Sequence, residues 1–145
     1  MTAGVHRRIS RRFRSDRGGI SPFILVLLPA LVGLAGLAYD GGNLFTGRRE
    51  ANTVAAAAAR AGANDLLEAS IYAGSPELAP SAASTATGFA FAQGASAASA
   101  RRVDVDLIEV NVSWTVDMEF LGIFGVGAQT VSGSAQARAL QGITG

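Results

Sequence analysis

The side chains that usually perform catalysis are scarce in this 145-residue chain, which has one histidine and no cysteine. His6 has no second histidine to work with, so neither a hydrolase triad nor a histidine-based metal site can be assembled. The lack of cysteine excludes thiol nucleophiles, thiolate metal sites and disulfides, and the lack of lysine excludes a phosphate-binding loop of the usual type. We therefore expect no enzymatic activity and no cofactor.

The acidic residues offer one alternative chemistry. Asp104 and Asp106 are two residues apart, which would place them on one face of a strand, with Glu109 and Asp117 further along. Carboxylates grouped in this way can bind a calcium ion. Alternating acids on an exposed strand are far more often simply solvated, and this is the interpretation we favour.

Charge is distributed unevenly along the chain. After Tyr39, six arginines stand against ten acidic residues, so this part offers no basic face and we expect no nucleic-acid binding. Before the apolar stretch the balance is reversed, because Asp16 is the single acid against six arginines: Arg7, Arg8, Arg11, Arg12, Arg14 and Arg17.

The stretch 20–39 contains no charged residue, and a helix of this length rises about 30 Å, which matches the hydrocarbon core of a bilayer. We predict a transmembrane helix here, with the bilayer as its first partner. The arginines before the span hold residues 1–19 in the cytoplasm as a basic tail and place the rest outside, which gives a single-pass topology in the cytoplasmic membrane. Pro29 removes the hydrogen bond to the Leu25 carbonyl, so we expect a modest bend.

A cleaved secretory signal is the alternative interpretation of the same stretch. The arginines would form its charged region, and Gly36-Leu37-Ala38 offers a small-x-small cleavage site. The product would be a secreted or surface binding module released by signal peptidase. We favour the anchor, because the apolar run is longer than a usual signal core.

The segment 43–72 is rich in alanine and contains no proline, which predicts a helix that ends near Gly74 and Pro76, so that 40–74 extends outside the membrane. At 100° per residue, small side chains form a stripe along one face of the continuous helix. Such a stripe lets another helix approach closely, although a chain this rich in Ala and Gly also produces stripes by chance. The predicted helix-packing residues, which also allow self-association, are Gly33, Gly36, Gly47, Ala51 and Ala58, with Pro29 and Asp40 in the same sector.

Residues 75–145 are predicted to form a small outer α+β domain. Residues 80–93 are expected to be a short helix, and apolar residues alternate with polar ones from Val110 to Phe120, which is typical of a half-buried strand. Residues 103–107 alternate in the opposite phase, which predicts a bulge or turn near Leu107, and 130–140 form a further strand. A small antiparallel sheet packed on helix is the simplest fold.

Between the last two predicted strands, residues 121–127 are unusually apolar for a loop. One interpretation is a tip that docks a partner or touches the membrane through Ile123, Phe124 and Val126. The other, slightly favoured, is that the loop folds back to cap the small core.

Several segments occur in a recognisable order: Asp16-Arg17-Gly18-Gly19, Leu28-Pro29-Ala30-Leu31, Gly36 to Gly42, Arg48-Arg49-Glu50-Ala51, Ala55 to Ala63, Phe120 to Gly125 and Thr130 to Ala135. In this order they resemble the TadE/TadG-like proteins of tight-adherence (Flp, type IVb) pilus systems. The resemblance is clearest over 17–63 and looser toward the C-terminus. It implies a pilin-like α+β fold with a single N-terminal membrane helix, and a non-enzymatic accessory role in pilus assembly or secretion, with other pilus-assembly membrane proteins or pilins as partners. A small membrane-stress or lysis protein that merely shares an alanine-rich helix is a third possibility.

One departure from prepilins bears on mechanism. In such proteins a peptidase cuts after Gly, and a Glu five residues further on neutralises the new terminal amine of a neighbouring subunit. Here the fifth residue after Gly19 is Ile24, and after Gly18 it is Phe23. Neither can pair an ammonium group, and an unpaired charge in hydrocarbon is costly. We therefore expect an uncut, anchored accessory component instead of the major pilin.

Overall fold

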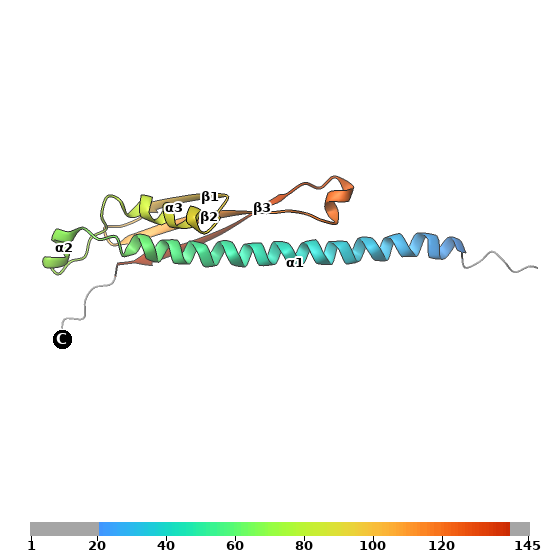
Figure 1. Ribbon diagram of the computed structural model, residues 1–145. Coiled ribbons are helices and arrows are strands. Elements are labelled where there is room, and N and C mark those ends of the chain that lie inside the picture. The colour runs from blue at the N-terminus through green and yellow to red at the C-terminus, as the bar shows by residue number, and fades with distance from the viewer. Residues whose placement is uncertain (1–20, 140–145) are drawn as a thin grey trace, which may run out of the picture.

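The computed structural model describes residues 21–139 of the chain. Ser21–Ala63 form one uninterrupted helix, α1, whose 43 residues extend about 65 Å (Figure 1). The helix continues through Pro29 without a break in its secondary structure. The remaining elements are α2 (Glu68–Tyr72), α3 (Ala82–Ala92), β1 (Ala97–Arg102), β2 (Leu107–Val116), the 3-10 helix η1 (Leu121–Phe124) and β3 (Gln129–Arg138).

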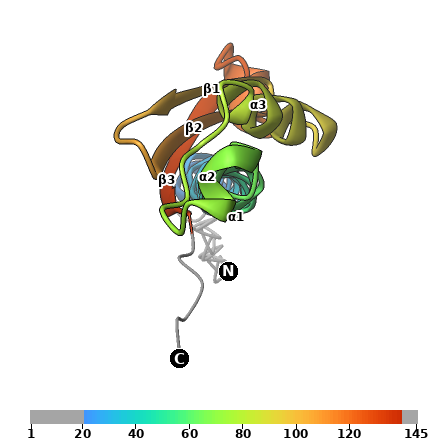
Figure 2. The ribbon, with the colours of Figure 1, turned by 90° about the vertical axis from the view of Figure 1, so that its left-hand side faces the viewer.

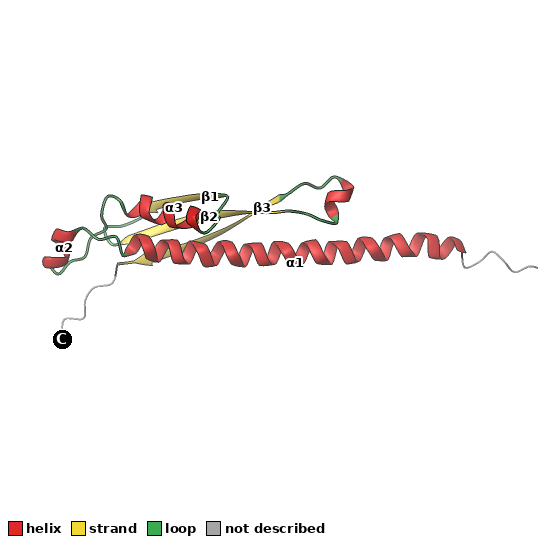
Figure 3. Ribbon diagram, in the orientation of Figure 1, coloured by secondary structure: helices red, strands yellow, loops and turns green. Residues whose placement is uncertain are grey.

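Helix α1 has two halves with different surroundings. Its N-terminal end extends beyond the other elements (Figure 3). Large apolar side chains of this half, from Phe23 to Leu37, are exposed. Among the described residues, α1 is the one helix long and apolar enough to cross a membrane, and this stretch lies near its N-terminal end. Its second half is covered by the strands and by α3. One helix therefore serves both as a candidate anchor and as part of a folded domain.

The sheet has three antiparallel strands in the order β1-β2-β3. Val110 at the centre of β2 lies opposite Ala100 on β1 and Ala135 on β3. Seen along α1, the sheet curves over the two longer helices, with α1 beneath β3 and β2 and with α3 nearer to β1 (Figure 2). The opposite face of the sheet is left uncovered within residues 21–139. The expected α+β class and antiparallel sheet are confirmed.

The core lies between the sheet and the two helices, and most of its helical members are alanines. Alanine keeps helix and strand backbones close together but buries little apolar area per residue. The larger buried side chains come from β2 and from the segment before α3. The buried cluster consists of Val54, Ala55, Ala58, Ala59, Ala63, Leu78, Ala82, Ala86, Ala90, Ala95, Ile108, Val110, Val112 and Ala139.

The predicted helix over 43–72 is wrong in its second part, since α1 ends at Ala63 and a separate short helix, α2, follows. The chain leaves the helix at Asn64 so that Leu66 can form an isolated bridge with Leu78. The Leu67 N–H donates to the Glu77 carbonyl at 2.8 Å, and the turn lets Leu78 reach the core, where it is almost fully buried. Tertiary packing thus overrides a favourable local helix propensity.

The strand predictions are corrected at two places. Residues 103–106, whose alternation predicted an extended run with a bulge or turn near Leu107, form the turn between β1 and β2. In this turn, Val103 and Asp104 donate their N–H groups to the Leu107 carbonyl. The sequence pattern does not predict strand β1, because its sequence AASARR contains no large apolar residue. Strand β2 ends at Val116 instead of Phe120, because the following residues turn toward α1. The short helix predicted over 80–93 is confirmed as α3.

Glycines mark the places where strands approach the α1 backbone most closely. A methyl group on Gly133 of β3 would collide with the backbone of Ala51 and Asn52, and one on Gly47 would collide with Val116. Both glycines are buried, whereas Gly42 has nothing within 4 Å of the corresponding position. The absence of a side chain at Gly47 and Gly133 is thus what lets the sheet lie against the helix.

We expect Gly47→Ala to destabilise the protein by about 1–3 kcal/mol, because the new methyl group overpacks the contact with Val116. Gly42→Ala is the matched control on the same helix. It gains about 0.5–1 kcal/mol of helix propensity and meets no neighbour. Thermal unfolding followed by circular dichroism in detergent measures both. Equal melting temperatures for the two variants would contradict the close approach described above.

Candidate functional site

The carboxylate of Asp40 is completely buried although it lies in the middle of α1. It accepts three backbone hydrogen bonds from the segment that follows β2. The Glu119 and Phe120 N–H groups donate to Oδ1 at 3.1 and 3.4 Å, and the Leu121 N–H donates to Oδ2 at 2.7 Å. A buried carboxylate is tolerable only when its oxygens are satisfied in this way. Asp40 therefore fixes the start of η1 to the helix.

Small and aromatic residues complete this junction. Gly36 lies one turn before Asp40, and a methyl group there would come within 2.7 Å of the Phe120 Cβ. The Phe120 ring packs edge-on against Tyr39, with 5.5 Å between ring centroids. Met118, two residues before Phe120, is buried. The end of β2 is thus held to α1 by a charge, a close backbone approach and an aromatic pair.

The apolar tip, residues 121–126, extends from this junction as η1 and its following turn (Figure 1). Ile123 and Phe124 are 78% and 76% exposed, and Val126 is 37% exposed. The interpretation that this loop folds back to cap the core is therefore wrong. The three hydrogen bonds to Asp40 hold the start of the tip at α1, away from the core, and Gly125 turns the chain with a φ of 87°. The role of the three residues as a partner contact stays a prediction.

The predicted helix-packing residues of the small-residue stripe on α1 differ in whether the rest of the chain covers them. Four of its residues are buried by other parts of the same chain and not by a helix of another molecule: Gly36, Gly47, Ala51 and Ala58. Gly33 differs, because nothing lies within 4 Å of a methyl group built there. Close approach of another helix at this stripe therefore stays a prediction, and among the five predicted packing residues only Gly33, at the apolar N-terminal end, is left open for it. The topological arginines, Arg7, Arg8, Arg11, Arg12, Arg14 and Arg17, lie outside the described residues.

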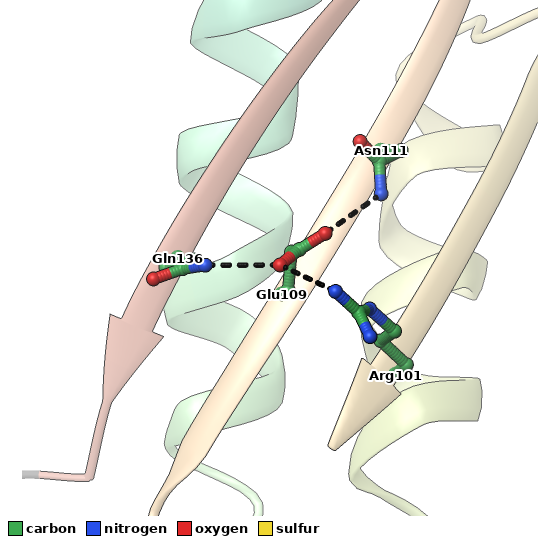
Figure 4. Close-up of polar contacts among 4 residues, drawn as sticks. All are labelled: Arg101, Glu109, Asn111 and Gln136. Atoms are coloured by element: carbon green, nitrogen blue, oxygen red, sulfur yellow. Dashed lines mark hydrogen bonds and ion pairs between the residues drawn. The ribbon is translucent and has the colours of Figure 1, made fainter. Parts of the chain in front are cut away.

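The uncovered face of the sheet carries a polar cluster centred on Glu109 (Figure 4). Its Oε2 accepts hydrogen bonds from Gln136 Nε2 at 2.9 Å and Arg101 Nη2 at 3.1 Å, and its Oε1 accepts one from Asn111 Nδ2 at 3.4 Å. The bonds from Gln136, then Arg101 and Asn111, lower the pKa of Glu109 below its ordinary value. The three donors come from three different strands, so the cluster ties the sheet together.

The acids considered as cation ligands are used elsewhere. Asp106 forms an ion pair with Arg138 at 3.1 Å, and an oxygen of Asp104 accepts the Val105 N–H at 2.8 Å. Within residues 21–139, no group of three or more His, Asp or Glu side chains is placed to hold a metal ion. These two acids serve the fold.

Sequence reasoning places Asp40 in the small-residue stripe and assigns it no partner. The sequence does contain a hint of this role, because Asp40 lies on the same helical face as Gly36 and Gly47, where its carboxylate has no obvious hydrogen-bond donor nearby in the sequence. What the sequence lacks is the identity of the donors, because they are backbone N–H groups 79 to 81 residues away.

Comparison with known families gives one finding. Residues 18–65 match the family model described as "Putative Flp pilus-assembly TadE/G-like". The matched region covers α1 from its apolar start to its end in the domain core, and it confirms the resemblance deduced from the ordered motifs. Searches of curated proteins and of solved structures found no match.

We expect Asp40→Asn to loosen the junction, because an amide keeps one acceptor oxygen and places an NH₂ group where the second carboxylate oxygen accepted a hydrogen bond. The loss is about 1.5–3 kcal/mol, the usual range for hydrogen bonds to a charged group. Glu50→Gln is the matched control, since Glu50 is an exposed acid on the same helix. Amide hydrogen exchange over residues 117–126 should accelerate in Asp40→Asn and not in the control. Unchanged exchange in both variants would show that Asp40 does not hold the tip.

The Glu109 cluster predicts an acid-sensitive sheet. Because the folded-state pKa lies below the ordinary 4.5, the stabilisation is fully present above that value and is lost as pH falls through the folded pKa. The melting temperature should therefore fall as the pH is lowered from above 4.5 through the folded-state pKa of Glu109. Glu109→Gln should reduce the decrease in melting temperature that accompanies the fall in pH. Asp65 adds a second contribution of the same sign, because hydrogen bonds from Thr85 and Ser81 lower its pKa. Identical pH profiles for the parent protein and Glu109→Gln would refute the assignment to Glu109.

Proposed function

We propose that this chain is a non-enzymatic, membrane-anchored accessory component, minor pilin-like in build, of a tight-adherence pilus or secretion apparatus. The observation that carries the proposal is the match of residues 18–65 to a TadE/G-like pilus-assembly family. That match coincides with a helix whose first half exposes apolar side chains and whose second half is built into a small α+β domain. A long helix that leaves one end free for membrane or partner and packs its other end on an antiparallel sheet is the build expected of a pilin-like protein.

Anchoring is supported by the way the domain uses α1. Cleavage after Ala38, the alternative signal-peptidase site, would remove Gly36 and with it the surface on which Phe120 packs. It would also leave Asp40 next to a new terminus, although its carboxylate is the acceptor for three N–H groups. The junction is therefore better suited to an intact helix than to a released module. The arginine-rich flank favours a cytoplasmic N-terminus and an extracytoplasmic domain.

An accessory role is favoured over that of the major filament subunit. Phe23 and Ile24 occupy the positions where a prepilin carries its neutralising Glu, and both are exposed apolar residues at the start of α1. A filament built from cleaved subunits would leave the new amine of each without a partner in an apolar surrounding. We infer that the chain stays uncut in the membrane and contacts other assembly proteins or pilins through α1 and the outer domain.

The experiment is deletion of the gene in its source cell, followed by complementation with the parent chain. Deletion should abolish or strongly reduce surface pili, counted by electron microscopy, and the parent chain should restore them. The mass of the protein extracted from the membrane fraction should correspond to an uncut N-terminus. The Ser99→Cys variant should react with a membrane-impermeant maleimide applied to the outer face, because the chain has no other cysteine.

The outcomes separate the parts of the proposal. Normal piliation in the deletion strain would contradict the proposed role in the pilus apparatus. A terminus at Gly19 or Ile20 would show prepilin-type cleavage, and one at Tyr39 would favour the released binding module. If the Ser99→Cys variant reacts only after lysis, the topology is reversed.

A further inference from the structure

The apolar tip, residues 121–126, lies beside the membrane half of α1 instead of above it. Its first residues are fixed to Asp40, and Phe120 packs on Gly36 and Tyr39. If the hydrocarbon core begins at residue 20 and is about 30 Å thick, it ends near Tyr39, and Gly36 lies about 4.5 Å inside it. We infer that the tip inserts into the outer leaflet of the bilayer at its interface, as a second membrane contact of the chain.

The composition of the tip suits lipid better than water. Ile123 and Phe124 are large apolar residues that are mostly exposed, and no charged residue occurs from Phe120 to Ala137. The neighbouring half of α1 also exposes apolar side chains, among them Leu34 and Leu37. Apolar faces that enter membrane interfaces are buried about 5–10 Å into the boundary between headgroups and acyl chains. The tip extends the lipid-facing surface of the helix sideways.

Several backbone N–H groups in and just before the tip find acceptors inside the protein, which lowers the cost of moving this segment out of water. Glu119, Phe120 and Leu121 donate to Asp40. The remaining turns close internally, since the Ile123, Gly125 and Val126 N–H groups donate to the carbonyls of Phe120, Gly122 and Leu121 at 3.2, 3.0 and 3.0 Å. The segment can therefore leave water without leaving these six groups unpaired.

The surroundings of the tip limit how deep it can go. Asp117 and Glu119 are exposed on its domain side, and charged groups favour the aqueous side of the interface. Tyr39 and Phe120 form an aromatic pair at the same level, and aromatic rings are common at membrane boundaries. These features describe shallow insertion, with Ile123 and Phe124 in the boundary layer and the sheet above it. The domain would then be held at a defined tilt to the membrane.

The inference rests on α1 crossing the bilayer, as proposed above, and the test separates the two. Three single-cysteine variants at exposed positions, Leu34→Cys, Ser99→Cys and Ile123→Cys, are labelled with an environment-sensitive fluorophore. The full chain is reconstituted into phosphatidylcholine vesicles that carry a nitroxide either near the headgroups or at the bilayer centre. The label at position 123 should shift to shorter wavelength and lose roughly twice as much emission to the headgroup nitroxide as the label at position 99.

The label at position 34, in the span, should respond instead to the central nitroxide. If position 34 responds and position 123 behaves like position 99, the tip is in water and the inference is overturned while the anchor stands. If position 123 is shielded only in native membranes that contain the pilus apparatus, a protein partner covers the tip and the lipid contact is again overturned. If position 34 does not respond, α1 does not span and both claims fail. Piliation does not enter this measurement, so loss of the pilus role would leave it unaffected.

Discussion

A single buried carboxylate connects the two halves of this protein. Asp40 accepts N–H groups from three consecutive residues that lie about 80 positions later in the chain. A charge in the middle of a helix would otherwise need water, and burying it without partners would cost several kcal/mol. Because its donors are backbone groups, these hydrogen bonds fix the path of the chain after β2, and with it the position of the apolar tip beside the exposed apolar half of α1.

The absence of side-chain bulk is what allows this arrangement. Gly36 admits Phe120, Gly47 admits Val116, and Gly133 lets β3 approach the α1 backbone at Ala51 and Asn52. In the core, the buried alanines of α1 and α3 allow similarly close approach between the helices and the sheet. Such close packing gains many short dispersion contacts while burying little area, so the fold depends on the fit between helix and sheet and tolerates added atoms poorly.

The long helix joins two environments without a break. Its exposed apolar half has the length and composition of a membrane span, and its second half forms the centre of a domain that the strands complete. The TadE/G-like match, residues 18–65, covers both halves of α1. The proposed role rests on this match and on the continuity of α1, which joins the candidate anchor to the domain.

The sequence alone determined the apolar helix, the α+β class, the strand β2 with its period of two, the short helix α3 and the family resemblance, because each depends on local composition or order along the chain. It did not determine where α1 ends, that AASARR forms an edge strand, or that the apolar tip is exposed. Those outcomes depend on contacts between distant residues: Leu66 with Leu78, β1 with β2, and Asp40 with the N–H groups of 119–121. The stripe of small residues shows the same division. Its existence was visible in the spacing, but what covers most of it, other parts of the same chain, was decided by tertiary packing, since spacing describes a surface and not what lies on it.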